Sequence, residues 1–186
     1  MSIVSAGILV VLVSVAAIVV AGEDSGHRLH EAHVHGVGAL NLAREGADLY
    51  LELSTPAANL VGFEHAPGNA QQQAQLQQVR AWLSEPARLI VLPEDARCHL
   101  AAAEVEMPSA GNVGAPSAHL DPDDTATHAD IHAEYRFVCD RPSALDGLDV
   151  LLFELFPALH RLQVQYIVPG GQAAAVLTPR EHRLNF

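Results

Sequence analysis

The chain has 186 residues, enough for one domain, and aromatic residues make up only 5 % of it, so its core must be mainly aliphatic. The formal net charge is −12, with 10 basic residues that are all arginine. Such an acidic chain repels nucleic acid and anionic lipid, which excludes both as expected partners, but it attracts cations. The 11 histidines supply imidazole, the most common metal ligand.

The N-terminal segment is apolar and uncharged from residue 3 to residue 22. The small residues Val19, Val20 and Ala21 resemble those before a signal-peptide cleavage site. A stretch of about 20 apolar residues is also long enough to remain as an uncleaved bilayer anchor. We therefore predict that residues 1–22 are a signal peptide or membrane anchor, that residues 27–186 form an exported domain, and that any membrane contact is through an uncleaved segment.

Two strands and one helix are predicted in the next part of the chain. In residues 34–54, apolar and polar side chains alternate on both sides of a turn at residues 45–48, which is typical of half-buried strands. Residues 68–86 predict an amphipathic helix, with Asn69 as its N-cap and Pro86 ending it. Leu76, Val79 and Leu83 recur at helical spacing, and the glutamines between them form the solvated side.

Further strands are expected in the C-terminal half. Residues 87–93, 97–107 and 128–139 have strand character, and residues 161–177 predict a hairpin turning at Pro169, Gly170 and Gly171. The apolar residues 148–156 fit either a strand or a helix. Residues 108–127, rich in Pro, Gly, Ser and Asp, predict a mobile acidic loop. The predicted fold class is α+β: a single domain with a mainly antiparallel β-sheet and one amphipathic helix packed on it.

Cys98 and Cys139 are the only two cysteines in the chain. In an exported protein an even number of cysteines predicts a disulfide. A pair of thiolate zinc ligands is the alternative, although the sequence has no CxxC spacing.

Two histidine-rich segments are candidate metal sites. The first, HEAHVHG, contains His30, His33 and His35; if the chain is extended from Glu31, then Glu31, His33 and His35 lie on one face. A solvated polar start of a strand is the alternative interpretation. We expect His27 to take no part in binding.

The second segment, HADIHAEYRFVC, places His128, Asp130, His132 and Glu134 on one face and apolar residues on the other. Imidazole together with carboxylate suits Zn²⁺, with Cu²⁺ and Ni²⁺ as competitors. An ordinary polar sheet face is the alternative.

Four stretches together resemble the ZrgA family of periplasmic zinc-binding proteins: HEAHVHGVGALNLA, LELSTPAANLVGFEHAP, HADIHAEYRFVC and FPALHRLQVQYIVPGGQAAAVL. They occur in order along nearly all of the exported part, and NLVGFEHAP is the most specific. The segment between the two cysteines departs from the family, whose members typically carry a long His-, Asp- and Glu-rich loop there. This departure predicts a few surface sites instead of a high zinc capacity.

The resemblance implies a non-enzymatic protein of the periplasm that binds Zn²⁺ and assists zinc acquisition, beside a zinc ABC importer or its binding protein. The metal ligands that it implies are His30, His33, His35, His65, His128, Asp130 and His132. It also implies that Cys98 and Cys139 match the family's cysteine pair.

Two other functions are open from the residues alone. A zinc-dependent hydrolase needs three ligands, a water and a general base such as Glu31 or Glu134, but the chain has no HExxH or comparable frame. A β-rich envelope protein that binds a partner protein would carry its histidines incidentally.

Overall fold

The larger of two sheets is built around the hairpin predicted for residues 34–54. The computed structural model describes residues 34–108 and 129–186. In it the strands β1 (Val37–Glu45) and β2 (Asp48–Pro56) are antiparallel. Gly46 in the connecting turn has a φ of 57°, a conformation that glycine adopts without steric cost. The predicted alternation is confirmed on β2, where Leu49, Leu51 and Leu53 are all buried.

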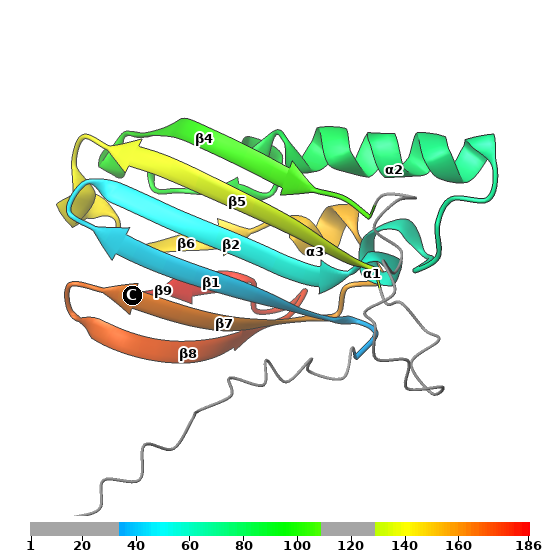
Figure 1. Cartoon of the computed structure of the whole chain (residues 1–186). Coiled ribbons are helices and arrows are strands. Elements are labelled where there is room, and N and C mark those ends of the chain that lie inside the picture. Colours follow the sequence, from blue (N-terminus) through cyan, green and yellow to red (C-terminus); the bar gives the residue numbers. More distant parts are fainter. Residues whose placement is uncertain (1–33, 109–128) are drawn as a thin grey trace, which may run out of the picture. The chain divides into compact units, whose positions relative to one another are not determined.

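Six strands form this sheet, in the order β4-β5-β2-β1-β7-β8 (Figure 1). The other four are β4 (Cys98–Glu106), β5 (Asp130–Cys139), β7 (Arg161–Val168) and β8 (Gly171–Leu177). All neighbours are antiparallel except β1 and β7, which pair in parallel. The prediction of a mainly antiparallel sheet is therefore confirmed, whereas the parallel pairing of β1 with β7 was not predicted.

A second sheet of three short strands was also not predicted. It has the order β3-β6-β9 and consists of β3 (Ile90–Val91), β6 (Gly147–Val150) and β9 (Arg183–Asn185). The ambiguous apolar run 148–156 turns out to be both kinds of structure, because β6 is followed by the short helix α3 (Leu152–Leu155). The remaining short helical segments are α1 (Ala57–Val61), η1 (Pro86–Arg88), η2 (Glu94–Ala96) and η3 (Pro142–Ala144).

The core lies on one side of the six-stranded sheet. The helices and the small sheet lie behind it in Figure 1, and no described helix or strand covers the front of the sheet, which is called its open face below. Burial follows this arrangement, because Leu40, Leu162 and Ile131 point into the core while Asn41, Gln163 and Glu134 are exposed. Residues Ala32–Phe186 form one compact unit. In the described parts of the chain, no helix is long and apolar enough to cross a membrane.

The predicted helix is α2 (Ala70–Leu83), and its C-terminal end is tied to the sheet. The side chain of Asn69 accepts a hydrogen bond from the backbone N–H of Gln72, as expected of an N-cap. At the other end, the Tyr135 hydroxyl on β5 donates a 2.8 Å hydrogen bond to the Leu83 carbonyl oxygen. Burial raises the pKa of Tyr135, because the charged phenolate is poorly solvated there.

We predict that Tyr135→Phe lowers the free energy of unfolding by about 1–2 kcal/mol, because it leaves the buried Leu83 carbonyl without its donor. Chemical denaturation monitored by circular dichroism measures the change. Tyr50→Phe is the matched control, since Tyr50 lies on the open face and is exposed. Equal stabilities of the two variants would contradict the role given to the Tyr135 hydroxyl.

The predicted disulfide is present between Cys98 and Cys139, with an S–S distance of 2.02 Å. The two cysteines are directly opposite each other, at the start of β4 and the end of β5. Both sulfurs are bonded to each other, so the alternative of two thiolate zinc ligands is wrong for this structure. The disulfide fixes the two strands together at the end of the sheet far from α1 (Figure 1).

Removing this disulfide with Cys98→Ala and Cys139→Ala should lower the free energy of unfolding by about 3–4 kcal/mol, from the chain entropy regained by the unfolded state. Urea unfolding of the oxidised protein and of the double variant measures this difference. A reduced wild-type sample should match the variant. If reduction has no effect on the urea midpoint, the bond does not contribute to stability.

Candidate metal site

His35 lies in a turn just before β1. The backbone N–H of Val37 donates a 3.0 Å hydrogen bond to the Val34 carbonyl, and Gly36 has a φ of 82°. The strand therefore begins at Val37, and the expectation that His35 is part of an extended strand is wrong. Glycine in the left-handed region ends the extended conformation at this point. Glu31 and the predicted ligands His30 and His33 lie outside the described residues.

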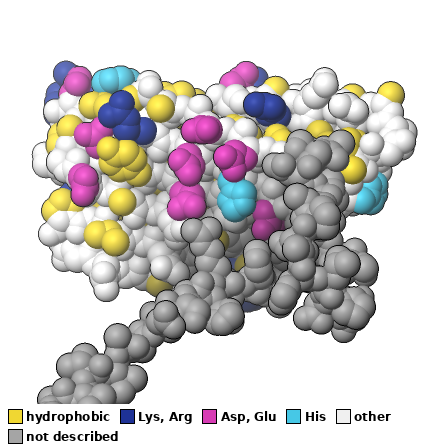
Figure 2. Space-filling model, viewed as in Figure 1, with side chains coloured by type: hydrophobic (Ala, Val, Ile, Leu, Met, Phe, Trp, Pro, Cys, Tyr) yellow, Lys and Arg dark blue, Asp and Glu magenta, His cyan; other side chains and the backbone are white. Residues whose placement is uncertain are grey.

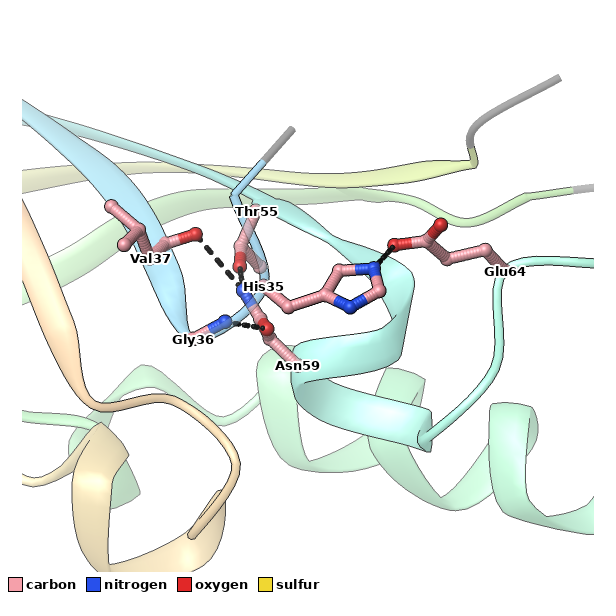
Figure 3. Close-up of polar contacts among 6 residues, drawn as sticks. All are labelled: His35, Gly36, Val37, Thr55, Asn59 and Glu64. Atoms are coloured by element: carbon pink, nitrogen blue, oxygen red, sulfur yellow. Dashed lines mark hydrogen bonds and ion pairs between the residues drawn. The ribbon is translucent and has the colours of Figure 1, made fainter. Parts of the chain in front are cut away.

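Asn59 on α1 holds this turn in place (Figure 3). Its Oδ1 accepts a 2.6 Å hydrogen bond from the Gly36 N–H, and its Nδ2 donates to the Val37 carbonyl and to Thr55 Oγ1, both at 2.9 Å. Apart from Tyr135 with its hydroxyl, Asn59 and Thr55 are the only buried polar residues in the described parts of the chain. Both lie where β1, β2 and α1 meet, and both side chains are hydrogen-bonded there.

The opposite side of the turn is fixed by the approach to β7. The Gly36 carbonyl accepts hydrogen bonds from the backbone N–H groups of His160, at 2.8 Å, and Arg161, at 3.0 Å. A Cβ atom at position 36 would lie 2.9 Å from Cδ2 of the His160 ring. Glycine is thus required both by its φ and by this close contact, and the turn has little freedom to move.

The rigid turn presents His35 to a carboxylate from another segment. His35 Nε2 lies 3.0 Å from Glu64 Oε1, as Figure 3 shows. The His35 side chain is 71 % exposed and that of Glu64 is 19 % exposed. Glu64 follows α1, and the C-cap residue of that helix, Gly62, has a φ of 79°. The contact thus brings together an accessible imidazole and a largely buried carboxylate, two ligand types that suit Zn²⁺.

Glu64 was not among the ligands predicted from the sequence. The available signal was its position next to His65 in the specific stretch NLVGFEHAP. Its pairing with His35, 29 residues earlier, depends on tertiary structure and could not be seen in the local pattern.

His65 is next to Glu64 in the sequence, and among the described residues only one of its ring nitrogens has a hydrogen-bond partner. Its ring stacks on Phe63, with a centroid distance of 5.1 Å. Its Nδ1 is 2.8 Å from the Ala66 carbonyl oxygen, which can only accept a hydrogen bond. The proton of neutral His65 is therefore on Nδ1, and the lone pair of Nε2 is left for a metal ion.

Asp130 and His132 occupy the beginning of β5, and the predicted alternation is confirmed there. Both are half-buried on the open side of the sheet, while Ile131 and Ala133 between and after them are buried. His132 lies opposite Ser54 on β2 and opposite Glu106 on β4. The predicted ligand His128 lies outside the described residues.

All the described candidates are at one end of the sheet. Here β1 begins, β2 runs into α1 and β5 begins, with the Ala57 N–H donating to the Ala129 carbonyl at 2.8 Å. Among these described candidates, a direct contact joins His35 and Glu64. Within residues 34–108 and 129–186, no three His, Cys, Asp or Glu side chains are grouped closely enough to hold a metal ion. The described residues therefore provide parts of sites and not a complete ligand set.

We predict that Asn59→Ala lowers the free energy of unfolding by about 2–3 kcal/mol, because it leaves the Gly36 N–H and the Val37 carbonyl without partners. Thermal and urea unfolding measure the loss. Asn41→Ala is the matched control, since Asn41 is exposed on β1 and makes a single 3.4 Å contact with Glu52. A loss no larger than that of the control would show that the turn does not depend on Asn59.

A protein-family model described as "ZrgA family zinc uptake protein" matches residues 32–186. Comparison with curated individual proteins finds no match. The family match begins at Ala32 and so includes His33, His35 and every other predicted ligand except His30.

Proposed function

Because the chain belongs to the ZrgA family of zinc uptake proteins, we propose that it binds Zn²⁺ in the periplasm and assists its delivery to a zinc ABC importer. In this proposal the protein is a non-enzymatic carrier, exported by its N-terminal segment. The observation that supports it best is the 3.0 Å contact between His35 Nε2 and Glu64 Oε1.

The contact has the chemistry of a zinc site that exchanges its metal. Imidazole nitrogen and carboxylate oxygen are preferred zinc ligands, and Cu²⁺ and Ni²⁺ are the competing ions for the same donors. A structural zinc site is enclosed by its four ligands, whereas His35 is 71 % exposed. An ion held here could therefore be reached by solvent or by an acceptor protein, as delivery requires.

The proposed ligands extend beyond this pair. The first group of proposed ligands is His35 in the turn before β1, Glu64 and His65 after α1, and His30 and His33. At the start of β5 we propose His128, Asp130 and His132. His35 Nε2 and Glu64 Oε1 now face each other, and both can bind a metal ion if it replaces the hydrogen bond between them. His65 can offer Nε2, because its Nδ1 is hydrogen-bonded to the Ala66 carbonyl. We propose the first group as the principal site, because a buried network fixes its turn.

Isothermal titration calorimetry with Zn²⁺ at pH 7.5 tests this function. The wild-type protein should bind at micromolar metal, and His35→Ala and Glu64→Gln should each weaken binding by about tenfold or more. Binding should also weaken below about pH 6, since a protonated imidazole has no lone pair for a metal ion. His99→Ala is the control, because His99 is exposed at the start of β4, at the end of the sheet far from α1.

The result that would contradict the function is an absence of Zn²⁺ binding by the wild-type protein. If Zn²⁺ binds but His35→Ala and Glu64→Gln behave like His99→Ala, then the principal site lies elsewhere. In that case His132→Ala distinguishes a site at the start of β5.

A further inference from the structure

The open face of the six-stranded sheet is hollowed into a groove of about 910 Å³. Strands β4, β5, β2, β1, β7 and β8 all contribute to its lining. None of the proposed metal ligands in the described residues lines this groove. It is therefore a second feature of the molecule, separate from the turn that carries His35.

One row of this groove is acidic. Glu134 on β5 is directly opposite Glu52 on β2 and also directly opposite Glu104 on β4. Side chains opposite each other on neighbouring strands are about 5 Å apart at Cβ, and like charges at this spacing destabilise a sheet. Figure 2 shows acidic side chains gathered near the middle of this face. Such a row of repelling charges favours an opposite charge supplied from outside.

The described residues do not supply that charge. Arg136 is the only arginine that lines the groove, and its Nη1 is 3.0 Å from Asp48 Oδ1. Glu52 has only the weak 3.4 Å contact from Asn41, and no ion pair of Glu104 or Glu134 is found within residues 34–108 and 129–186. The three carboxylates thus have no ion-pair partner in that part of the chain, and Arg136, two residues after Glu134 on the same face, is paired with Asp48.

The adjacent row of the same groove is apolar from β2 to β7, between Arg136 on β5 and Gln172 on β8. Tyr50 and Ile167 lie in one row on either side of Ala43, and their exposed fractions are 41 % and 59 %. The small side chain of Ala43 leaves space between the two larger ones. An acidic row beside an apolar row is complementary to a chain in which cationic and apolar side chains both occur, since lysine and arginine place their alkyl stems on apolar surface and their charge at its edge.

We propose that this groove binds an extended, cationic segment of a partner protein, with lysine or arginine on the Glu52, Glu104 and Glu134 carboxylates and apolar side chains on Tyr50 and Ile167. Neighbouring strands are about 4.8 Å apart, so three carboxylates on three strands extend over about 10 Å. An extended peptide places side chains of one face about 6.6 Å apart, and two such side chains cover the row. A second copy of this chain is poorly suited, because its net charge of −12 repels the same groove.

Fluorescence anisotropy tests the proposal. The probe is a labelled peptide of alternating lysine and valine, about nine residues long. The wild-type protein should bind this peptide more tightly than peptides of alternating lysine and serine or glutamate and valine. The triple variant Glu52→Gln, Glu104→Gln and Glu134→Gln should weaken binding by about tenfold. The control variant Glu94→Gln, Glu154→Gln and Glu181→Gln makes the same change of charge at exposed sites outside the groove and should bind like wild type.

Further results decide between this inference and its alternatives. Ile167→Ser should also weaken binding of the lysine and valine peptide, because it removes exposed apolar surface without changing charge. Equal binding by both triple variants, or no binding by wild type, overturns the proposal. Loss of Zn²⁺ binding in the groove variant without peptide binding by wild type would identify the row as a cation site instead. The proposal does not rest on zinc binding by His35, so either can fail alone.

Discussion

The hydrogen bonds of the Asn59 side chain are the interaction on which the candidate site depends. One amide group joins the turn before β1, the first residue of β1 and the last part of β2, through Gly36, Val37 and Thr55. It can do so because α1 starts directly at the end of β2 and turns Asn59 back into the corner. A buried amide with its polar atoms satisfied is stable, and any displacement would leave several buried groups unpaired. The exposed His35 is thereby attached to a rigid base.

The one-sided sheet separates stability from binding. Its buried face packs aliphatic residues against helices and the small sheet, and its disulfide and the Tyr135 hydrogen bond add to that side of the molecule. The polar groups that could bind a ligand lie on its open face and at the end next to α1. Histidine and carboxylate meet at the end, while carboxylates and apolar side chains meet in the groove. Substitutions on the open face should accordingly change binding with little effect on folding.

The parts of the fold that sequence predicts well are those with a repeated local pattern. Alternating leucines identify β2, and the Asn69 cap with Val79 and Leu83 identifies α2. The strands of the second sheet have two to four residues, which is too short for a period to be recognised. The parallel pairing of β1 with β7 joins distant segments, and no local signal specifies it.

The candidate site shows the same division. The alternation of polar and apolar residues on β5 correctly predicts that Asp130 and His132 lie on the other face of the sheet from Ile131 and Ala133. His35 was expected in a strand, but the glycine after it forms a turn. Gly36 is the residue in the sequence that indicates this turn. The pairing of Glu64 with His35 could only be found from the structure, because the two residues are 29 positions apart in the chain.

The most direct test of the account is a crystal of the protein soaked in Zn²⁺, with anomalous diffraction data collected above and below the zinc edge. The account predicts an anomalous peak about 2.0–2.1 Å from His35 Nε2, with a Glu64 oxygen also in the coordination shell. An anomalous peak only at other residues, with the His35–Glu64 hydrogen bond intact, would contradict it.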